Sequence, residues 1–471
     1  MQKGFLISLG KELSKKHDVI FIPRDKEVYN LIKIHASELA CEDEHVQSNF
    51  DCSIEKKEAV TQAIAVENKY NVRLYFLISQ DRALGRGYLL NAEGYPAISR
   101  SWWSHEEKIN AVLSQFHFIE QIIDAYRPDV IIGMQKLPVW SEVAGFYDIL
   151  YLSFSLAKIG SRVIVSDDNF MTSSLLLNNV RKYALCHDKD QSLFEAYEQE
   201  AGSKLNHSLI SYSFSSILGS VFSQIFSELY KVFTGKRKRN SYSLFGWVPV
   251  ILRRKLEYDY CKKFGRKPVD LNNYRLVYFA LHLEPEIAIQ GVSPEFNNSM
   301  EIVSWVSKSL PADALMVVKE HPLSYGIRSP KYYDMLRQMG NVVLAHPDID
   351  SWTWIRACKV VVSITGTVGV EAVNFLRPVL SFGSHQAINY LRTVRFADSF
   401  SSTRTAIDEL FSLSNDHNLL SLSQWAYRKA QLESSVDLSG FENNYSSSAL
   451  QPALSSKVVS HIYEIYNDIF S

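Results

Sequence analysis

Short apolar runs of strand length recur through residues 274–383, each followed by a turn and then a helical pattern. The run 315–318 ends in Lys-Glu-His-Pro at 319–322, and the run 360–364 breaks into Thr-Gly-Thr-Val-Gly at 365–369. Runs of this length and composition are typical of buried strands. Their alternation with helices predicts a parallel sheet whose ligand-binding loops follow the carboxyl ends of the strands. The second half of the chain is therefore expected to be a doubly wound α/β domain.

The elements expected in this half follow one another closely. We expect strands at 276–281, 315–318, 342–344, 360–364 and 379–382, helices at 300–309, 331–339, 352–358 and 370–375, and a terminal helix at 455–470. Residues 401–448 are polar and are expected to be partly helical.

Two of the turns carry groups that suit a phosphate. A glycine-rich turn before a helix leaves backbone N–H groups that can face an anion, helped by the helix dipole. A lysine and a histidine end what we take to be the neighbouring strand, and they can supply positive charge and a hydrogen-bond donor to the same phosphate. The alternative is that both turns serve only chain reversal and packing. The candidate phosphate-binding residues are Lys319, His321, Thr365, Gly366 and Thr367.

The first half also alternates between helices and strands. We expect helices at 6–16, 105–126 and 141–159, and strands at 19–22, 73–78, 130–132 and 162–165. No strand precedes the first helix, so the first strand of this domain either is missing or lies upstream of Met1. Asp81 and Arg82 follow the strand expected at 73–78, where a polar loop suits either a binding site or a surface ion pair.

Composition excludes several classes of protein. The formal net charge of the 471 residues is −1, so no general affinity for nucleic acid is expected. The five cysteines lack C-x-x-C spacing, which argues against a disulfide framework or a zinc site and favours a reducing compartment. We read neither a signal peptide nor a transmembrane helix, so a cytoplasmic protein is expected.

The middle of the chain contains a long amphipathic pattern. Apolar residues recur at helical spacing through 214–233, the other face is mostly Ser and Gln, and Lys-Arg-Lys-Arg follows at 236–239. One interpretation is a patch that meets anionic lipid at a membrane surface. The alternative is a core helix followed by a solvated basic linker. The near absence of Lys and Arg from the helix itself counts against the membrane interpretation.

Four stretches together resemble one known family. Residues 277–286, 319–322, 365–372 and 377–383 are similar, in this order, to the capsular polysaccharide biosynthesis family. That family includes bacterial glycosyltransferases that make surface glycans, some of which use CMP-activated 3-deoxy-octulosonate (CMP-Kdo). The resemblance covers residues 274–395 and does not identify the sugar.

The resemblance implies a GT-B architecture, in which two Rossmann-like α/β domains face a cleft. We then expect four ranges: an N-terminal acceptor-side domain, a helical and basic insertion or linker, a nucleotide-sugar-binding domain, and a helix that crosses back to the N-terminal domain. These ranges are 1–200, 201–270, 271–450 and 451–471.

The implied reaction assigns roles to individual residues. Transfer from a nucleotide sugar needs a stabilised leaving phosphate and a base for the acceptor hydroxyl. By resemblance, His321 contacts the nucleotide phosphate, and by analogy Glu371 binds the ribose hydroxyls; the alternative for Glu371 is a charge favoured by the helix dipole. The candidate catalytic residues are Glu286, favoured by the resemblance, and Asp81 with Arg82, favoured by position. Asp168 and Glu284 are further candidate bases, and each acid has the alternative of being solvated or ion-paired.

We expect no catalytic metal and no cofactor beyond the nucleotide sugar itself. Asp348-Ile349-Asp350 has the D-x-D pattern of metal-dependent sugar transferases, but Ser351-Trp352 follow, which favours a helix cap. The expected partners are a nucleotide sugar, a glycan or lipid-linked acceptor, and the cytoplasmic face of the inner membrane through peripheral contact. Two alternative functions remain: a UDP-sugar 2-epimerase-like enzyme and a non-catalytic partner in capsule assembly or export.

Overall fold

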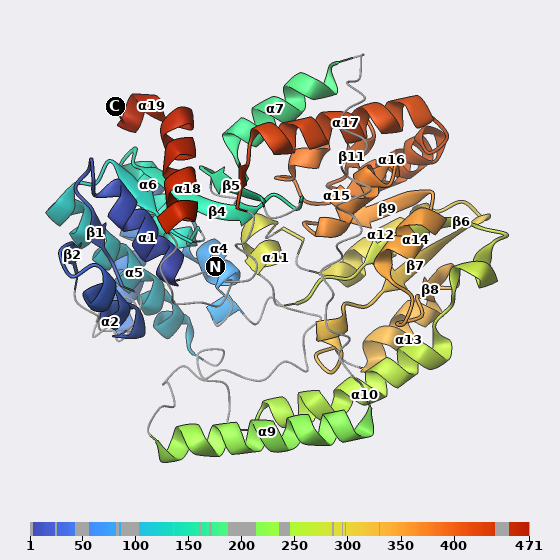
Figure 1. Cartoon of the computed structure of the whole chain (residues 1–471). Helices are drawn as coiled ribbons and strands as arrows, with labels where there is room; N and C mark the ends of the chain where they lie inside the picture. The colour runs from blue at the N-terminus through green and yellow to red at the C-terminus, as the bar shows by residue number, and fades with distance from the viewer. Residues whose placement is uncertain are drawn as a thin grey trace. The chain divides into compact units, whose positions relative to one another are not determined.

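The computed structural model describes most of the chain and divides it into two compact units (Figure 1). Unit 1 comprises residues 1–78, 104–179 and 429–471, and unit 2 comprises residues 79–103 and 180–428. Both contain helices packed on sheets, so the α/β class is confirmed, whereas the four ranges expected from the sequence stay predictions. The described residues are 3–23, 26–42, 56–81, 84–85, 103–134, 136–159, 162–168, 172–186, 213–234, 245–284, 287–293, 295–296, 298–328, 330–438 and 452–470.

Unit 2 is built on a six-stranded parallel sheet with the order β11-β10-β9-β6-β7-β8. The chain lays strands on one side of β6 as far as β8 and then returns to the other side with β9, so the winding reverses between β6 and β9. The strands are β6 (Arg275–Ala280), β7 (Ala314–Lys319), β8 (Val342–Leu344), β9 (Val360–Ser363), β10 (Val379–Ser381) and β11 (Val394–Phe396).

Helices cover both faces of this sheet. Val277 and Phe279 of β6 pack in one core with α12 and α16, whereas the ring of Tyr278 points to the other face and stacks on Trp354 of α14. Burial on both faces explains why the strands are continuous apolar runs. The helices of unit 2 are α9 (Phe214–Phe233), α10 (Trp247–Phe264), α11 (Ile287–Val292), α12 (Ser299–Ser309), α13 (Pro330–Gln338), α14 (Ser351–Ala357), α15 (Thr367–Asn374), α16 (Phe400–Leu413) and α17 (His417–Glu433).

Unit 1 contains a mixed sheet with the order β12-β5-β4-β3, together with the short parallel pair β1-β2. The pair β3-β4 is parallel, and β5 is antiparallel to both of its neighbours. The elements are α1 (Lys3–Leu13), β1 (Ile20–Phe21), α2 (Lys26–His35), β2 (Ala40–Cys41), α3 (Lys56–Tyr70), α4 (Leu74–Gln80), α5 (His105–Tyr126), β3 (Val130–Ile132), α6 (Pro138–Phe146), β4 (Leu150–Leu156), β5 (Arg162–Ser166), α7 (Ser174–Ala184), β12 (Val436–Asp437), α18 (Pro452–Ile465) and α19 (Asn467–Phe470).

The two ends of the chain share one core in unit 1. Phe5 and Leu9 of α1 are buried with Val458 and Ile462 of α18, next to the apolar side chains of β4 and β5. The helices α1 and α18 therefore lie side by side (Figure 1).

Two elements of unit 1 differ from the sequence prediction. Residues 73–78 were expected to be a strand, but α4 occupies this place and buries Leu74, Leu77 and Ile78 on one side. The expected helix at 141–159 stops at Phe146, and the strand β4 follows after Asp148, whose φ is 54°. A left-handed residue at that point ends the helical turn and redirects the chain.

The middle helix α9 forms as expected, but it is not a core helix. Ile217 and Glu228 are its buried residues, whereas most of its aromatic side chains are exposed. The core-helix interpretation is therefore wrong. Across the described ranges, no helix combines the length and the hydropathy needed to cross a bilayer.

Candidate functional site

The loops that follow β6, β7 and β9 leave the same edge of the parallel sheet of unit 2. The sequence interpretation placed the ends of β7 and β9 next to each other, but both strands pair with β6, which lies between them. Neighbouring strands are about 4.8 Å apart, so the two loops start about 10 Å from each other. Loops at the carboxyl ends beside a reversal of winding are where open α/β sheets bind ligands.

The loop after β9 leads into an uncapped helix N-terminus. α15 begins at Thr367, and its N-cap is Gly366, which makes no side-chain cap hydrogen bond to the first turn. Thr367 is exposed, and Thr365 is buried. The N–H groups of such a turn, with the positive end of the helix dipole, suit an anion. Glu371, expected to begin the helix, instead lies in its second turn.

A histidine to which the sequence analysis assigned no role, His282, lies against the turn at Gly366. A Cβ atom added at Gly366 would lie 2.8 Å from Cε1 of His282, so only glycine fits without displacing the ring. His282 follows β6 directly and is buried. It brings the loop after β6 into contact with the loop after β9. The resemblance stretch 277–286 contains His282, so its position in the sequence was available as a signal.

His321 is held by two hydrogen bonds of its own loop. Its backbone N–H donates to Oε1 of Glu320 at 2.8 Å, and its ring Nδ1 accepts from the N–H of Leu323 at 3.2 Å. Because Nδ1 is an acceptor, the neutral ring carries its proton on Nε2. The half-buried ring is therefore a hydrogen-bond donor through Nε2.

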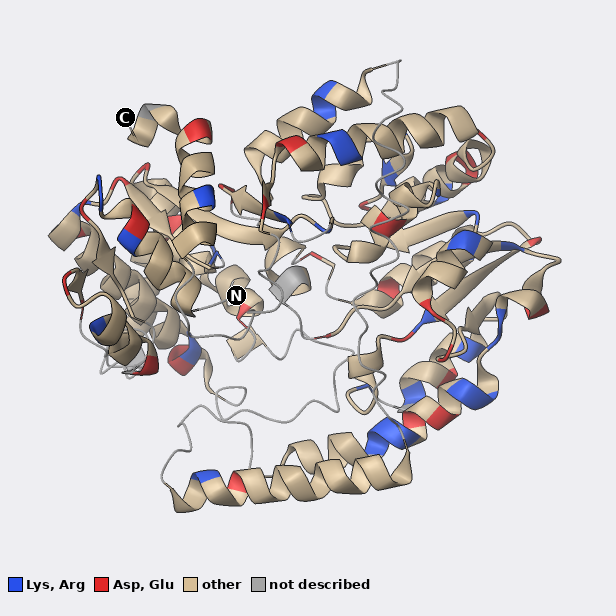
Figure 2. Cartoon of the chain, in the orientation of Figure 1, with Lys and Arg blue, Asp and Glu red and all other residues tan. Residues whose placement is uncertain are grey.

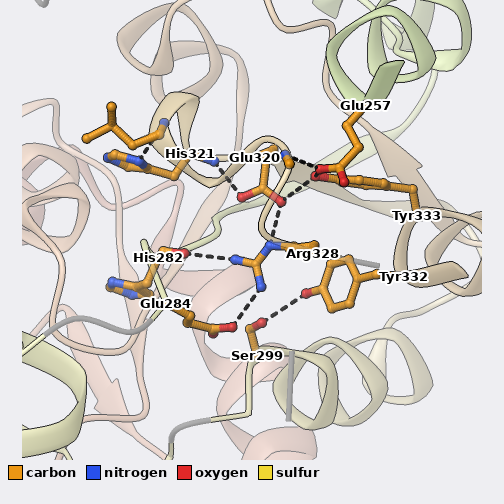
Figure 3. Close-up of polar contacts among 11 residues, drawn as sticks. Glu257, His282, Glu284, Ser299, Glu320, His321, Arg328, Tyr332 and Tyr333 are labelled. Atoms are coloured by element: carbon orange, nitrogen blue, oxygen red, sulfur yellow. Dashed lines mark hydrogen bonds and ion pairs between the residues drawn. The ribbon is translucent and has the colours of Figure 1, made fainter. Parts of the chain in front are cut away.

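A buried arginine joins the loops after β6 and β7 (Figure 3). Arg328 donates to Oε2 of Glu320 at 2.5 Å, to Oε2 of Glu284 at 2.7 Å and to the carbonyl oxygen of His282 at 2.8 Å. Its side chain is 1% exposed. Burial opposes the charge, but the carboxylates of Glu320 and Glu284 raise the pKa of Arg328 above its usual range. The network positions His282 and His321 without itself reaching solvent.

A carboxylate from α10 fastens the same loop from the other side. Oε2 of Glu257 accepts from the N–H of Gly326 at 2.6 Å and from the hydroxyl of Tyr333 at 3.3 Å. Burial raises the pKa of Glu257 to about 7. Gly326 has a φ of 85°, and a Cβ there would meet the carbonyl oxygen of Val250 at 2.1 Å. The loop is thus packed tightly against α10.

Lys319 points away from the two loops. It is buried, its Nζ donates to the carbonyl oxygen of Pro347 at 3.0 Å, and burial lowers its pKa. Pro347 follows β8, so the ammonium lies on the β8 side of β7, whereas Gly366 follows β9 on the other side of β6. This contact favours a structural role for Lys319.

The candidate bases lie in different surroundings. Glu284 is occupied by Arg328 and is not available as a base. Asp81 follows the helix α4 rather than a strand, and its Oδ1 accepts from the N–H of Leu84 at 2.8 Å. In unit 1, Asp168 accepts from the N–H of Thr172 at 2.8 Å. Arg82 and Glu286 lie outside the described residues.

The D-x-D pattern caps a helix, as expected. Asp350 is the N-cap of α14, and its Oδ1 accepts from the N–H of Thr353 at 3.1 Å. Asp348 pairs with Lys262 at 3.2 Å. Within the part of the chain that the structure describes, no three His, Cys, Asp or Glu residues are grouped to hold a metal ion.

The sequence matches one family model. Residues 186–418 match the model of capsule polysaccharide biosynthesis proteins, and this segment contains the loops described above. The search of the curated proteins found no match.

Several solved structures match parts of this chain. The KpsC β-Kdo 2,7-transferase of Thermosulfurimonas dismutans is 13% identical, over 62% of this chain and 79% of that chain, with a TM-score of 0.32. MnaA of S. aureus, solved with UDP, is 12% identical over 76% and 81%, with a TM-score of 0.26. The UDP-GlcNAc 2-epimerase of Methanocaldococcus jannaschii is 12% identical over 70% and 83%, with a TM-score of 0.26. Likenesses of this extent do not assign an activity.

Proposed function

Since residues 186–418 belong to the capsule polysaccharide biosynthesis family, we propose that this chain is a glycosyltransferase. It moves a sugar from a nucleotide-sugar donor, for example a CMP-Kdo-like donor, to a growing surface polysaccharide or a lipid-linked glycan. The donor binds at the loops that follow β6, β7 and β9 of unit 2. The protein works in the cytoplasm and contacts the inner membrane peripherally.

One observation carries the proposal. The N-terminus of α15 has no side-chain cap, and the close contact of Gly366 with His282 keeps this turn free of a Cβ atom. Backbone N–H groups in this arrangement stabilise the negative charge that develops on a leaving phosphate. Thr365, Gly366 and Thr367 supply this part of the site.

His321 and α15 contact different groups of the donor. Their loops start on strands separated by β6, about 10 Å apart. Because β6 separates the two loops, we assign them to different groups of the donor rather than to one phosphate. The Nε2 proton of His321 therefore serves a second phosphate or a hydroxyl of the sugar or ribose, and Glu371 is kept as a candidate for the ribose.

The remaining chemistry needs a base for the acceptor hydroxyl. With Glu284 paired to Arg328, the candidates are Glu286 and Asp81, with Arg82 beside the latter. A general base of this kind contributes about 10²–10⁴-fold to the rate. Glu286→Gln and Asp81→Asn therefore separate them, because only one is expected to lose at least about 100-fold in kcat. We propose further that transfer needs neither a metal ion nor a cofactor besides the donor.

Nucleotide binding tests the proposal first. CMP, UDP, GDP and CDP are each added to the full chain, and the nucleotide that binds raises the melting temperature. His321→Ala is expected to weaken that nucleotide at least about tenfold, a loss of about 1.4 kcal/mol. His346→Ala is the matched control, because Nδ1 of His346 also accepts from a backbone N–H two residues further on, at 3.3 Å.

Equal affinity for the nucleotide in His321→Ala and His346→Ala would contradict the assigned site. Release of the nucleotide that depends on an added glycan acceptor supports the transferase. Conversion of the nucleotide sugar without an acceptor would instead identify an epimerase. Failure of all four nucleotides to bind would identify a non-catalytic partner in capsule assembly.

A further inference from the structure

The helix α9 turns its most apolar side to solvent. It carries eight of the 28 large exposed apolar side chains among the described residues, although it has only 20 residues. Phe222, Phe226 and Phe233 are 69%, 75% and 85% exposed. An exposed stripe of this length marks a docking surface rather than chance exposure. We call it the aromatic stripe; it consists of Phe214, Leu218, Phe222, Phe226, Tyr230 and Phe233, at three- or four-residue spacing.

The opposite arrangement would be expected if α9 only completed the core. Its side toward the protein contains Ile217, Gln224 and Glu228 together with the half-buried Val221 and Ile225. Gln224 donates to Glu228 at 3.4 Å. Glu228 also pairs with Lys231 at 2.8 Å. The side of α9 toward the protein is thus a mixture of aliphatic and polar groups, while the aromatic groups face outward. An aromatic face that its own domain leaves exposed is typical of a helix that buries this face against something else.

The surroundings of the aromatic stripe are uncharged or basic. Ser215, Gly219, Ser223 and Ser227 line its side with small groups, so nothing bulky separates the stripe from a flat surface. By sequence, residues 214–264 contain ten basic and three acidic residues, a net charge of +7 in a chain whose net charge is −1. Figure 2 shows α9 largely free of charge and basic residues grouped along α10.

The positive charge of the segment 214–264 favours an anionic bilayer over a second copy of the chain as the partner of the stripe. In a symmetric dimer the same patch meets itself, and two segments of charge +7 would repel each other. An anionic bilayer complements both features, because aromatic side chains enter the boundary between headgroups and acyl chains while basic residues meet the headgroups.

We propose that the aromatic stripe of α9 docks on the surface of an anionic lipid bilayer. The inference deepens the peripheral membrane contact proposed above and rests on it, but it does not depend on sugar transfer. Insertion of the stripe supplies the affinity, and the basic residues of the segment 214–264 supply the preference for anionic lipid. The helix lies along the surface, about 30 Å in length.

Vesicle flotation of the full chain tests this docking. The vesicles are phosphatidylcholine alone or with phosphatidylglycerol, at 0.15 M salt, and no nucleotide is present. We expect the protein to float with the phosphatidylglycerol vesicles at least fivefold more than with phosphatidylcholine alone. Phe222→Ser with Phe226→Ser should lower the bound fraction at least tenfold. The matched control replaces Leu185 and Val269 of the same unit by Ser; they are 76% and 71% exposed.

Two flotation results would contradict the proposed docking on a bilayer. The proposal is wrong if the protein stays unbound with both vesicles, or if the Phe222, Phe226 variant floats as the parent does. Sedimentation equilibrium without lipid completes the test. A dimer that the Phe222, Phe226 variant abolishes, in a protein that does not float, would assign the stripe to a second copy. Nucleotide binding, measured separately, shows whether the donor site fails independently.

Discussion

Arg328 donates from Nε to Oε2 of Glu320 at 2.5 Å, and both side chains are almost completely buried. Glu320 in turn accepts from the backbone N–H of His321. The ion pair therefore fixes the backbone that presents the candidate phosphate ligand, and Arg328 also reaches Glu284 after β6. The Lys-Glu-His-Pro turn owes its shape to an arginine seven residues beyond His321.

Removal of the Arg328 charge should be costly. Arg328→Met leaves Glu320 and Glu284 buried without their partner, and a broken buried pair costs about 3–5 kcal/mol. Arg337→Met is the control, since Arg337 is 40% exposed and lies 3.9 Å from Asp334; a loss of about 1 kcal/mol or less is expected there. Urea unfolding measures both, and equal losses would refute the assignment.

A methyl group at Gly366 should disturb the donor site. Gly366→Ala places Cβ 2.8 Å from His282, so the ring must shift, whereas Gly340→Ala meets nothing within 4 Å. We expect Gly366→Ala to weaken the bound nucleotide at least about tenfold, or about 1.4 kcal/mol, and Gly340→Ala to leave it unchanged. Isothermal titration calorimetry checks this, and unaltered affinity in Gly366→Ala would place the nucleotide elsewhere.

Glu257 should make stability depend on pH. Burial raises its pKa from 4.5 to about 7, so the folded state binds a proton that the unfolded state releases. Its contribution is fully present below pH 4.5 and is lost as the pH rises through about 7. Relative to Glu257→Gln, the wild type should lose about 3 kcal/mol between about pH 4 and about pH 8.

Urea unfolding of both proteins across this pH range measures the difference. As the pH rises, the free energy of unfolding of Glu257→Gln should increase relative to that of the wild type. A difference that is constant with pH would mean that Glu257 has the same pKa in the folded and unfolded protein, and it would contradict this prediction.

Asp350 should act only as a helix cap. Asparagine caps a helix as well as aspartate does, so Asp350→Asn should keep both stability and transfer activity within about twofold. Asp350→Ala should lose about 1 kcal/mol of stability. Thermal unfolding and the transfer assay, each with and without EDTA, decide the matter. Loss of activity in Asp350→Asn at unchanged stability would point to metal binding.

The parallel sheet of unit 2 could be predicted because its strands are buried on both faces. The runs at β7, β9 and β10 are continuous and apolar, and the turn chemistry at their ends is equally visible. The cap at Asp350 was predictable for the same local reason. The order of the strands could not be predicted, because the sequences of β7 and β9 contain no sign that β6 lies between them.

The errors in unit 1 have local causes. Residues 73–78 are a short apolar run, which does not distinguish a strand from a buried helix, although Leu74, Leu77 and Ile78 have helical spacing. The strand β4 was missed because a helix was predicted across 141–159. The segment Leu150–Leu156 is apolar enough to fit a helical pattern as well as a strand pattern. Arg328 was missed because its role comes from tertiary contacts alone.

Gly326 lies five residues beyond His321, and Glu257, which accepts its N–H, lies in the middle of α10. The left-handed backbone at Gly326 and its close approach to Val250 pack this loop directly against α10. We therefore expect a displacement of α10 to shift the turn that presents His321. Docking of the proposed aromatic stripe on a bilayer is therefore expected to change the affinity of the proposed donor site.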